Sequence, residues 1–423
     1  MKRLLITLLL PWLLEAQSIP ELFDTLKAHP QVKADTLVVQ KSKIASDMVD
    51  SSLYPKIDLF ASYDNYSTAT GMVPVPPDQL LDMVKDKSVA QPFSTDIYRA
   101  GANFSMPIFV KSLYTTADKA EAMQRSAEAK KHINILKNEA LIVGANANFL
   151  YLVSLKKALD GKEKSLLETH KTLQIKVNNG RSPASALYKI NDSLNEVAIA
   201  KNNIDLQKQK LISSIESLTG VRLLEPVSME HIGKYEEGSF DSLKPLQEKI
   251  KADRASRKAQ KERLYPALYA HGSYVYSQGK AYNNGKDVDE TYGNIGLILK
   301  IPLLEMNQYD SIALSGVTLR ASEVELEKMR DELRAEAKML SSSLSLLENS
   351  QKLYTRSIEN KKELLKIAKV NFNSGRLSTE EYLRYEDAVV VQEANLYKTE
   401  ATQWQTEMQL AVIYANNIEE MVR

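Results

Sequence analysis

The sequence of 423 residues contains no cysteine, which excludes every kind of site that needs a thiol. These sites are disulfide frameworks, thiolate metal centres, thiol nucleophiles and the lipid-modified N-terminal cysteine of exported lipoproteins. Proline and glycine are scarce as well, with 14 and 15 residues. So few helix breakers are typical of a chain built from long, uninterrupted helices.

A charge excess of one sign is also lacking, because 55 Lys and Arg residues accompany 54 Asp and Glu residues. This balance gives no indication of nucleic acid or an acidic substrate as a partner. The five histidines lie on different predicted elements without metal-ligand spacing, and no glycine-rich phosphate loop follows a strand. The acidic residues are spread along predicted helix surfaces. We therefore expect a protein that is not an enzyme and needs no cofactor or metal.

The first 16 residues have the pattern of an export signal. Lys2 and Arg3 precede an apolar run from Leu4 to Leu14, and Ala16 marks the expected cleavage site. A buried helix start is the alternative, but the run is short for a spanning helix and the charges precede it. No later stretch approaches the roughly 20 apolar residues of a transmembrane helix. We expect a mature protein that is soluble or crosses a membrane as β-strands.

The chain repeats itself once, as aligned landmarks show. Pro107 corresponds to Pro302 and Gly180 to Gly375, both pairs 195 residues apart. A third pair, Tyr54-Pro55 and Tyr265-Pro266, is separated by 211 residues, so a length difference of 16 residues falls between the first two landmarks of each repeat. That interval is rich in Gly, Pro and Asn and is predicted to be a loop.

Each repeat opens with a helix that a proline ends. The predicted spans are Pro30–Leu53 and Pro245–Leu264, because the residue before Pro55 or Pro266 is disfavoured in the helical conformation. Two alternating segments of about ten residues follow in each repeat. The predicted apolar positions are Ile57, Leu59, Ala61 and Tyr63; Tyr98, Ala100, Ala102, Phe104 and Met106; Leu268, Ala270, Gly272, Tyr274 and Tyr276; and Ile295, Leu297, Leu299 and Ile301.

This alternation predicts strands with one apolar and one polar face, as in a transmembrane β-barrel. Half-buried hairpins of a soluble sheet would give the same pattern. Four strands cannot close on themselves, and lipid does not tolerate open sheet edges. A membrane location therefore requires several chains to contribute to one barrel.

Proline-free runs of 69 residues come next, from Phe109 to Val177 and from Leu304 to Phe372. As helices they would be on the order of 100 Å long and would need a bundle or coiled coil. Glycine turns end them, and new helices start at Ser182-Pro183, with Pro at N1, and at Ser378, with a capping box. These return to about Leu218 and Tyr414.

In order and spacing, these landmarks resemble the TolC family of outer-membrane efflux channels. The residues that carry the resemblance are His29-Pro30, Tyr54-Pro55, Met106-Pro107, Gly180-Arg181-Ser182 and Leu218-Thr219-Gly220, with Gly375-Arg376-Leu377-Ser378 in the second repeat. The implied fold is mainly α, with long helical hairpins and four transmembrane β-strands per chain. The resemblance also implies a homotrimer with a twelve-stranded barrel in outer-membrane lipid and an α-helical tunnel in the periplasm. Without the resemblance, a dimer with eight strands would also close.

The predicted domains are a signal peptide at 1–16, a first repeat at 17–220, an irregular linker at 221–242, a second repeat at 243–417 and a C-terminal tail at 418–423. The resemblance implies a passive exit duct of a tripartite efflux or secretion system, docked to a periplasmic adaptor and an inner-membrane transporter. The alternative is an exported periplasmic coiled-coil scaffold, which explains the helices but not the strands that both repeats keep in the same place.

The hairpin tips are the candidate sites. The resemblance assigns adaptor docking to Gly180, Arg181 and Ser182 at one tip and to Gly375, Arg376, Leu377 and Ser378 at the other. Glu381 falls at the position of an acidic gate residue in the family. Arg384 stands one turn later in place of a second acid, so we expect a mixed Glu381/Arg384 ring, joined by Lys189 from the neighbouring tip. The alternative for these charges is a solvated helix face.

Overall fold

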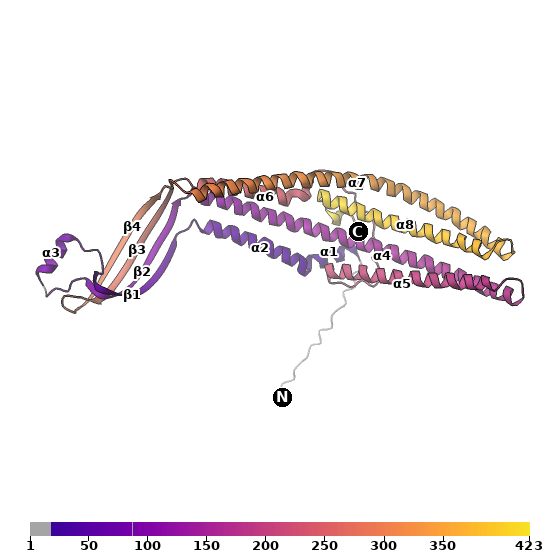
Figure 1. Cartoon of the computed structure of the whole chain (residues 1–423), viewed down its shortest axis with the longest axis horizontal. Helices are drawn as coiled ribbons and strands as arrows, with labels where there is room; N and C mark the ends of the chain where they lie inside the picture. The colour runs from indigo at the N-terminus through magenta and orange to yellow at the C-terminus, as the bar shows by residue number, and fades with distance from the viewer. Residues whose placement is uncertain (1–17, 87) are drawn as a thin grey trace, which may run out of the picture. The chain divides into compact units, whose positions relative to one another are not determined.

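The computed structural model describes residues 18–86 and 88–423, so the predicted signal peptide lies outside the described residues. The first repeat contains α1 (Ile19–Ala28), α2 (Pro30–Ser51), β1 (Lys56–Gly71), α3 (Pro77–Lys85), β2 (Phe93–Phe109), α4 (Lys111–Asn178) and α5 (Ser185–Thr219). The rest of the chain contains η1 (Asp241–Leu243), α6 (Lys244–Glu262), β3 (Ala267–Lys280), β4 (Asp287–Lys300), α7 (Met306–Asn373), α8 (Thr379–Tyr414) and η2 (Ile418–Glu420). Figure 1 shows these elements.

The two long helices agree with the sequence prediction. α4 and α7 both have 68 residues, which is on the order of 100 Å at about 1.5 Å per residue. α2 and α6 end shortly before Pro55 and Pro266, where the chain leaves the helical conformation. The returning helices α5 and α8 end at Thr219 and Tyr414.

Three local predictions differ from the structure. The strands have 14 to 17 residues rather than about ten, and Pro107 lies inside β2 beside a bulge. α5 starts at Ser185 and not at Pro183, because its first turn is of the tighter 3₁₀ type, with Ala186 N–H donating to the Pro183 carbonyl at 3.1 Å. The predicted first loop contains the short helix α3, which Pro77 opens.

The chain forms two compact units, and each takes segments from both repeats. Of the described residues, the bundle unit comprises 18–39, 128–245 and 326–423, and the sheet unit comprises 40–86, 88–127 and 246–325. α2, α4, α6 and α7 contribute to both units. The units cut across the duplication because elements of one repeat pair laterally with elements of the other.

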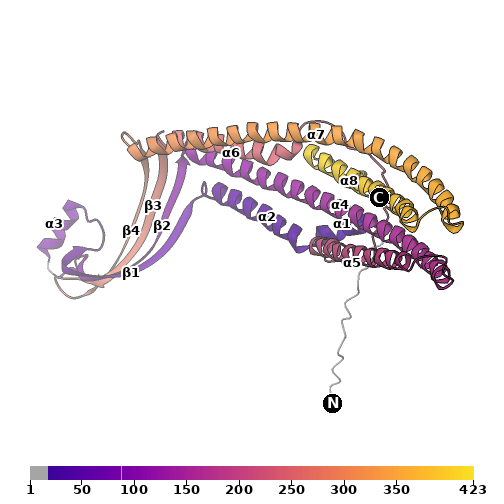
Figure 2. The same cartoon turned by 45° about the vertical axis from the view of Figure 1, so that its right-hand side comes forward.

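Within the bundle unit, the helices lie side by side in the order α5, α4, α8 and α7 (Figures 1 and 2). Lys156 Nζ on α4 lies 2.7 Å from Asp205 Oδ1 on α5, and Ser165 on α4 donates a hydrogen bond to Glu386 on α8. On the far side of α8, the ion pair between Lys362 and Glu393 joins it to α7 at 2.7 Å. α5 and α7 are therefore the two outer helices along most of this layer, and near the tips Lys189 of α5 also reaches α8 and Lys369 of α7 also reaches α4.

The bundle unit has its main apolar core where α1 and the C-terminal end pack on α4. Ile19, Leu22 and Phe23 of α1 are almost fully buried there, together with Ile418 of η2. The segment at 221–240 has no helix or strand, but Asn146 of α4 fixes it. The Asn146 side chain donates to the Val227 carbonyl at 2.7 Å and accepts from the Val227 N–H at 2.9 Å.

The sheet unit contains a four-stranded antiparallel sheet in the order β1, β2, β3, β4. The central pair, β2 and β3, joins the two repeats, with Ala102 opposite Tyr274. The helices of this unit are also cross-linked, since Arg125 of α4 bonds Glu248 of α6 at 3.0 Å and Ser322 of α7 bonds Asp253 of α6 at 2.7 Å.

Candidate functional site

The strand register places the predicted apolar residues of all four strands on one face of the sheet. Leu59 of β1 is opposite Ala102 of β2, Ala102 is opposite Tyr274 of β3, and Tyr274 is opposite Gly293 of β4. The other predicted apolar residues within the strands pair with one another in the same way. The predicted sheet with two different faces is therefore confirmed. Only Ile301 among the predicted positions lies outside, one residue beyond the end of β4.

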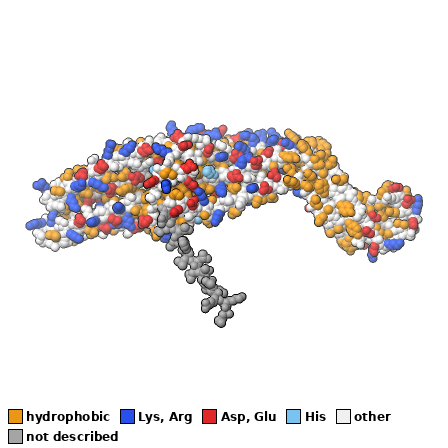
Figure 3. Space-filling view, turned by 180° about the vertical axis from the view of Figure 1, so that it is seen from behind, with side chains coloured by type: hydrophobic (Ala, Val, Ile, Leu, Met, Phe, Trp, Pro, Cys, Tyr) orange, Lys and Arg blue, Asp and Glu red, His pale blue; other side chains and the backbone are white. Residues whose placement is uncertain are grey.

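This apolar face is largely open to solvent in the single chain. Leu59 is 83% exposed and Ile295 is 86% exposed. The apolar surface continues past the sheet through Leu303, Leu304 and Met306, all strongly exposed. Figure 3 shows hydrophobic side chains gathered where the strands meet the helices. Soluble monomers rarely expose a contiguous apolar surface of this kind, which marks a contact with lipid or with another chain.

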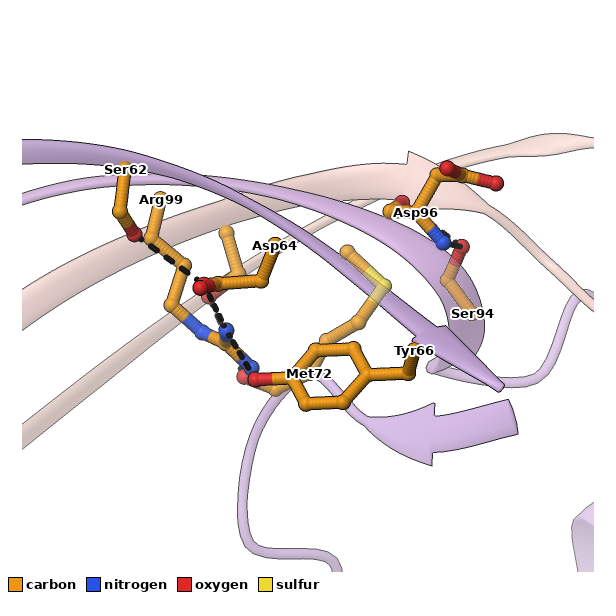
Figure 4. Close-up of polar contacts among 8 residues, drawn as sticks. Ser62, Asp64, Tyr66, Met72, Ser94, Asp96 and Arg99 are labelled. Carbon is orange, nitrogen blue, oxygen red and sulfur yellow. Dashed lines mark hydrogen bonds and ion pairs between the residues drawn. The ribbon is translucent and has the colours of Figure 1, made fainter. Parts of the chain in front are cut away.

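The opposite face of the sheet carries most of the polar side chains of the strands, together with a few apolar ones such as Phe60, Val275 and Ile298. Its charged, hydroxyl and amide side chains are Asp58, Ser62, Asp64, Arg99, Asn103, Ser105, Ser273, Ser277, Glu290 and Asn294. Near the end of the sheet remote from α2, α4, α6 and α7, Arg99 Nη1 donates to Asp64 Oδ2 at 2.8 Å and to the Tyr66 hydroxyl at 3.2 Å (Figure 4). The Arg99 guanidinium also lies over the Tyr66 ring.

The two outer strands leave open edges. In the described part of the chain, β1 pairs only with β2 and β4 pairs only with β3. Their backbone N–H and C=O groups on the outer side are available to another strand. An exposed, apolar edge of 14 to 16 residues is a template for pairing with a further chain.

The outer helices of the bundle unit carry exposed apolar residues at coiled-coil spacing. On α7, Met339, Leu346 and Leu353 are seven residues apart and more than half exposed. On α5, Ile199 and Leu206 have the same spacing and exposure. A heptad stripe on each outer helix is the pattern of a seam with a neighbouring helix.

The two hairpin tips have the predicted glycine caps. Gly180 has φ +66° and Gly375 has φ +78°, the left-handed conformation that glycine adopts without strain. The next amides close the turns, since Arg181 N–H donates to the Lys176 carbonyl at 2.8 Å and Arg376 N–H donates to the Asn371 carbonyl at 2.9 Å. Arg181, Gly375 and Arg376 are exposed.

At the second tip, Glu381 is engaged in the capping box of α8. Its Oε2 accepts from the Ser378 N–H at 3.0 Å and from the Ser378 hydroxyl at 2.8 Å, and the Ser378 Oγ accepts in turn from the Glu381 N–H at 3.2 Å. These hydrogen bonds lower the pKa of the Glu381 carboxyl. The predicted capping box is confirmed, and it occupies the carboxylate that the sequence assigned to an ion-pair ring.

Within the chain, the acid that joins the two predicted cations is Glu380. Lys189 Nζ of α5 lies 3.0 Å from Glu380 Oε2, and Arg384 Nη2 lies 2.9 Å from Glu380 Oε1. The hydrogen bond from Lys189 lowers the pKa of the Glu380 carboxyl, and Arg384 adds to the effect. The sequence reasoning missed Glu380, although its spacing of four residues from Arg384 was a signal for an ion pair.

A second polar contact behind the tip was also missed. Glu386 of α8 is 3% exposed and accepts hydrogen bonds from Ser165 of α4 and from the Tyr382 hydroxyl, while its other oxygen has no partner. Burial raises the pKa of Glu386 and raises the pKa of Tyr382 to about 12. Lys162 of α4 pairs with Asp387 beside it. No sequence spacing links residues more than 200 positions apart, so only the packing of α4 on α8 shows this contact.

Among residues 18–86 and 88–423, no three or more His, Cys, Asp or Glu side chains are grouped so that they could hold a metal ion. The same residues contain no helix with the length and apolar character of a membrane span.

Comparison of the fold with solved structures finds outer-membrane channels. The outer-membrane channel CmeC of Campylobacter jejuni superposes with a TM-score of 0.78 at 15% identity, over 94% of this chain and 85% of that chain. The outer-membrane protein VceC of Vibrio cholerae gives 0.76 at 13% identity, over 94% and 96%. The open state of the MtrE outer-membrane channel of Neisseria gonorrhoeae gives 0.77 at 12% identity, over 94% and 89%.

The sequence itself matches no protein-family model and no curated protein. The similarity lies in the path of the backbone, and at 11 to 15% identity it defines the fold. The chain has the fold of the TolC-like outer-membrane channels.

Proposed function

We propose that this chain is a subunit of an outer-membrane channel that serves as the passive exit duct of a tripartite efflux or secretion system. The observation that carries the proposal is the sheet, which exposes an apolar face and leaves both outer strands unpaired. β3 from Leu268 to Tyr276 is about 27 Å long at about 3.4 Å per residue. That length matches the apolar band of about 25 Å that faces lipid in outer-membrane barrels.

The strand order permits closure between copies. The strands alternate in direction from β1 to β4, so β4 of one copy and β1 of the next run antiparallel when placed side by side. The apolar faces of successive copies then form one outer surface, and the polar faces form the interior. Closure satisfies the edge N–H and C=O groups that lipid would leave without partners.

The proposed assembly is a homotrimer. Three copies supply twelve strands, and two copies would supply the eight of the smallest barrels. The choice of three follows the resemblance of the landmarks to the TolC family. The heptad stripes of α7 and α5 support lateral association, since each α7 edge would meet the α5 edge of the next copy.

The proposed partners are a periplasmic adaptor and an inner-membrane transporter, which would dock at the hairpin tips. Support comes from the form of the tips, which are short turns with exposed side chains such as Arg181 and Arg376. Docking through Gly180, Arg181 and Ser182, and through Gly375, Arg376, Leu377 and Ser378, stays a prediction.

The charges just inside the second tip are proposed as an aperture lock. Lys189 on α5 and Arg384 on α8 share Glu380, so one acid ties the two hairpins together. Glu381 supports the same region by capping α8. Glu380 therefore joins Glu381, Arg384 and Lys189 among the proposed gate residues.

Fractionation of cells that express the protein tests the proposed function. We expect the protein in the outer membrane, in oligomers that run at a higher mass on gels before heating than after it. A monomer released with the periplasmic contents would contradict the channel and favour the scaffold.

A further inference from the structure

The loop between β1 and β2, residues 72–86 and 88–92, starts on the polar face of the sheet. Ser277 of β3 is opposite Arg99, which places its side chain on the polar face. The Ser277 hydroxyl donates to the Met72 carbonyl at 3.1 Å. The backbone at Met72 therefore crosses the polar side of β3, two strands away from β1.

Burial on this face supports the same placement. Ile97 and Ser277 belong to the polar face by register, yet both are 0% exposed, and Met72 is 4% exposed. The opposite face at the same level keeps Tyr98 58% exposed. The chain thus covers its polar face at this end and leaves its apolar face open.

Contacts with β1, just before the loop, and with the loop backbone fix it there. On the β1 side, Arg99 holds Asp64 and Tyr66, as Figure 4 shows, and Met72 N–H donates to the Pro92 carbonyl at 2.9 Å. On the β2 side, the β3–β4 turn binds the loop backbone. The Asn283 side chain donates to the Val89 carbonyl at 2.8 Å, and the Asn284 side chain donates to the Ser88 carbonyl at 3.1 Å.

We propose that residues 72–86 and 88–92 form an inward-folded lid that narrows the outer mouth of the channel, with Arg99 positioning the end of β1 from which the lid leaves the sheet. The inference rests on the proposed function, because the polar face becomes the interior only when several copies close a ring. Each copy then contributes one lid, which contains α3, at the end of the barrel remote from α2, α4, α6 and α7. The shorter β3–β4 turn serves as the clamp of the lid and does not cover the interior itself.

Removal of the lid tests whether it narrows the channel. Gly71 of β1 pairs with Phe93 of β2, so an Asn-Gly turn in place of residues 72–92, Met72 included, can join the two strands. In planar bilayers, we expect the shortened protein to show a larger single-channel conductance than the full-length protein. An unchanged conductance would overturn the lid.

Cysteine labelling gives a second readout, because the chain has no cysteine of its own. Ser277→Cys should be protected from a water-soluble thiol reagent in the full-length loop and should react in the shortened variant. Ser105→Cys, an exposed polar-face position, should react in both. Equal reactivity of Ser277→Cys in the two backgrounds would contradict the inferred cover.

Point variants separate the positioning residue from a general loss of structure. Arg99→Gln should raise the conductance toward that of the shortened variant. Asp96→Ala removes the acceptor of a similar cluster with Tyr63 and Asn65 on the apolar face and should leave the conductance unchanged. If the unaltered protein forms no oligomeric channel, the proposed function fails. If it conducts but none of these changes affects conductance, only the lid fails.

Discussion

At the level of single residues, the tip of the second hairpin shows how one carboxylate can serve two elements. Glu380 accepts from Lys189 of α5 and from Arg384 of its own helix, while Glu381 accepts from Ser378. The two neighbouring acids therefore have different roles, one between helices and one within a helix cap.

Substitution of these two acids should separate the roles. Glu380→Gln removes the charge that both cations share, so we expect a higher open probability in planar bilayers. Glu381→Gln keeps the shared ion pairs and should change the open probability much less. Identical behaviour of Glu380→Gln and the unaltered protein would contradict the aperture lock, and a dominant effect of Glu381→Gln would return the gate to that residue.

The buried Glu139 of α4 makes the free energy of unfolding depend on pH. Its side chain is 2% exposed with one oxygen unpartnered, and burial raises its pKa to about 7, with Glu419 adding to the shift and Lys27 opposing it. The folded state therefore binds a proton more tightly than the unfolded state. The resulting penalty is absent below the ordinary pKa of a glutamate, grows as pH rises toward 7 and is complete above it.

Glu139→Gln should remove this dependence. At pH 8 we expect the variant to melt at a higher temperature than the unaltered protein. Its free energy of unfolding should be higher by up to about 3 kcal/mol. At pH 4 to 5 the two proteins should melt at similar temperatures. Thermal melts across this pH range provide the check, and a variant that is less stable at pH 8 would contradict the unfavourable burial.

At the level of elements, the periodicity of the sequence was sufficient to predict the long helices and the strands. The 68-residue helices, the glycine turns and the alternating faces depend on local rules that act within a few residues, so the sequence predicted them. The short helix α3 was missed because a segment with four prolines and glycines within seven residues favours a loop.

What the sequence could not predict depends on contacts between distant residues. The pairing of β2 with β3, the contact of Ser165 with Glu386 and the fold of the first loop over the polar face join positions about 170 to 220 apart. No local pattern specifies such pairs. Glu380 is the intermediate case, because its pairing with Arg384 is local and its pairing with Lys189 is not.

The stripe on α7 can be tested as an element. Leu346→Asp places a charge at the middle of the proposed seam, where burial of an unpaired carboxylate costs several kcal/mol. We expect the oligomer to dissociate in detergent, as followed by light scattering after size exclusion. Ser345→Asp, an exposed position beside the stripe, is the matched control and should keep the oligomer. Intact oligomers with Leu346→Asp would place the seam elsewhere.

At the level of the whole molecule, the single chain is incomplete in both of its units. The sheet unit has two unpaired edges and an exposed apolar face, and the bundle unit has apolar stripes on its two outer helices. The proposed oligomer would complete each unit separately, because further copies would pair with the sheet edges and pack on the apolar stripes.

The number of chains in the membrane-extracted particle tests this account most directly. Native mass spectrometry of protein extracted from the outer membrane in detergent should give three chains per particle. Two chains would retain the closed barrel but contradict the trimer. A single chain that leaves the cell envelope without detergent would contradict the central claim that several copies close one channel.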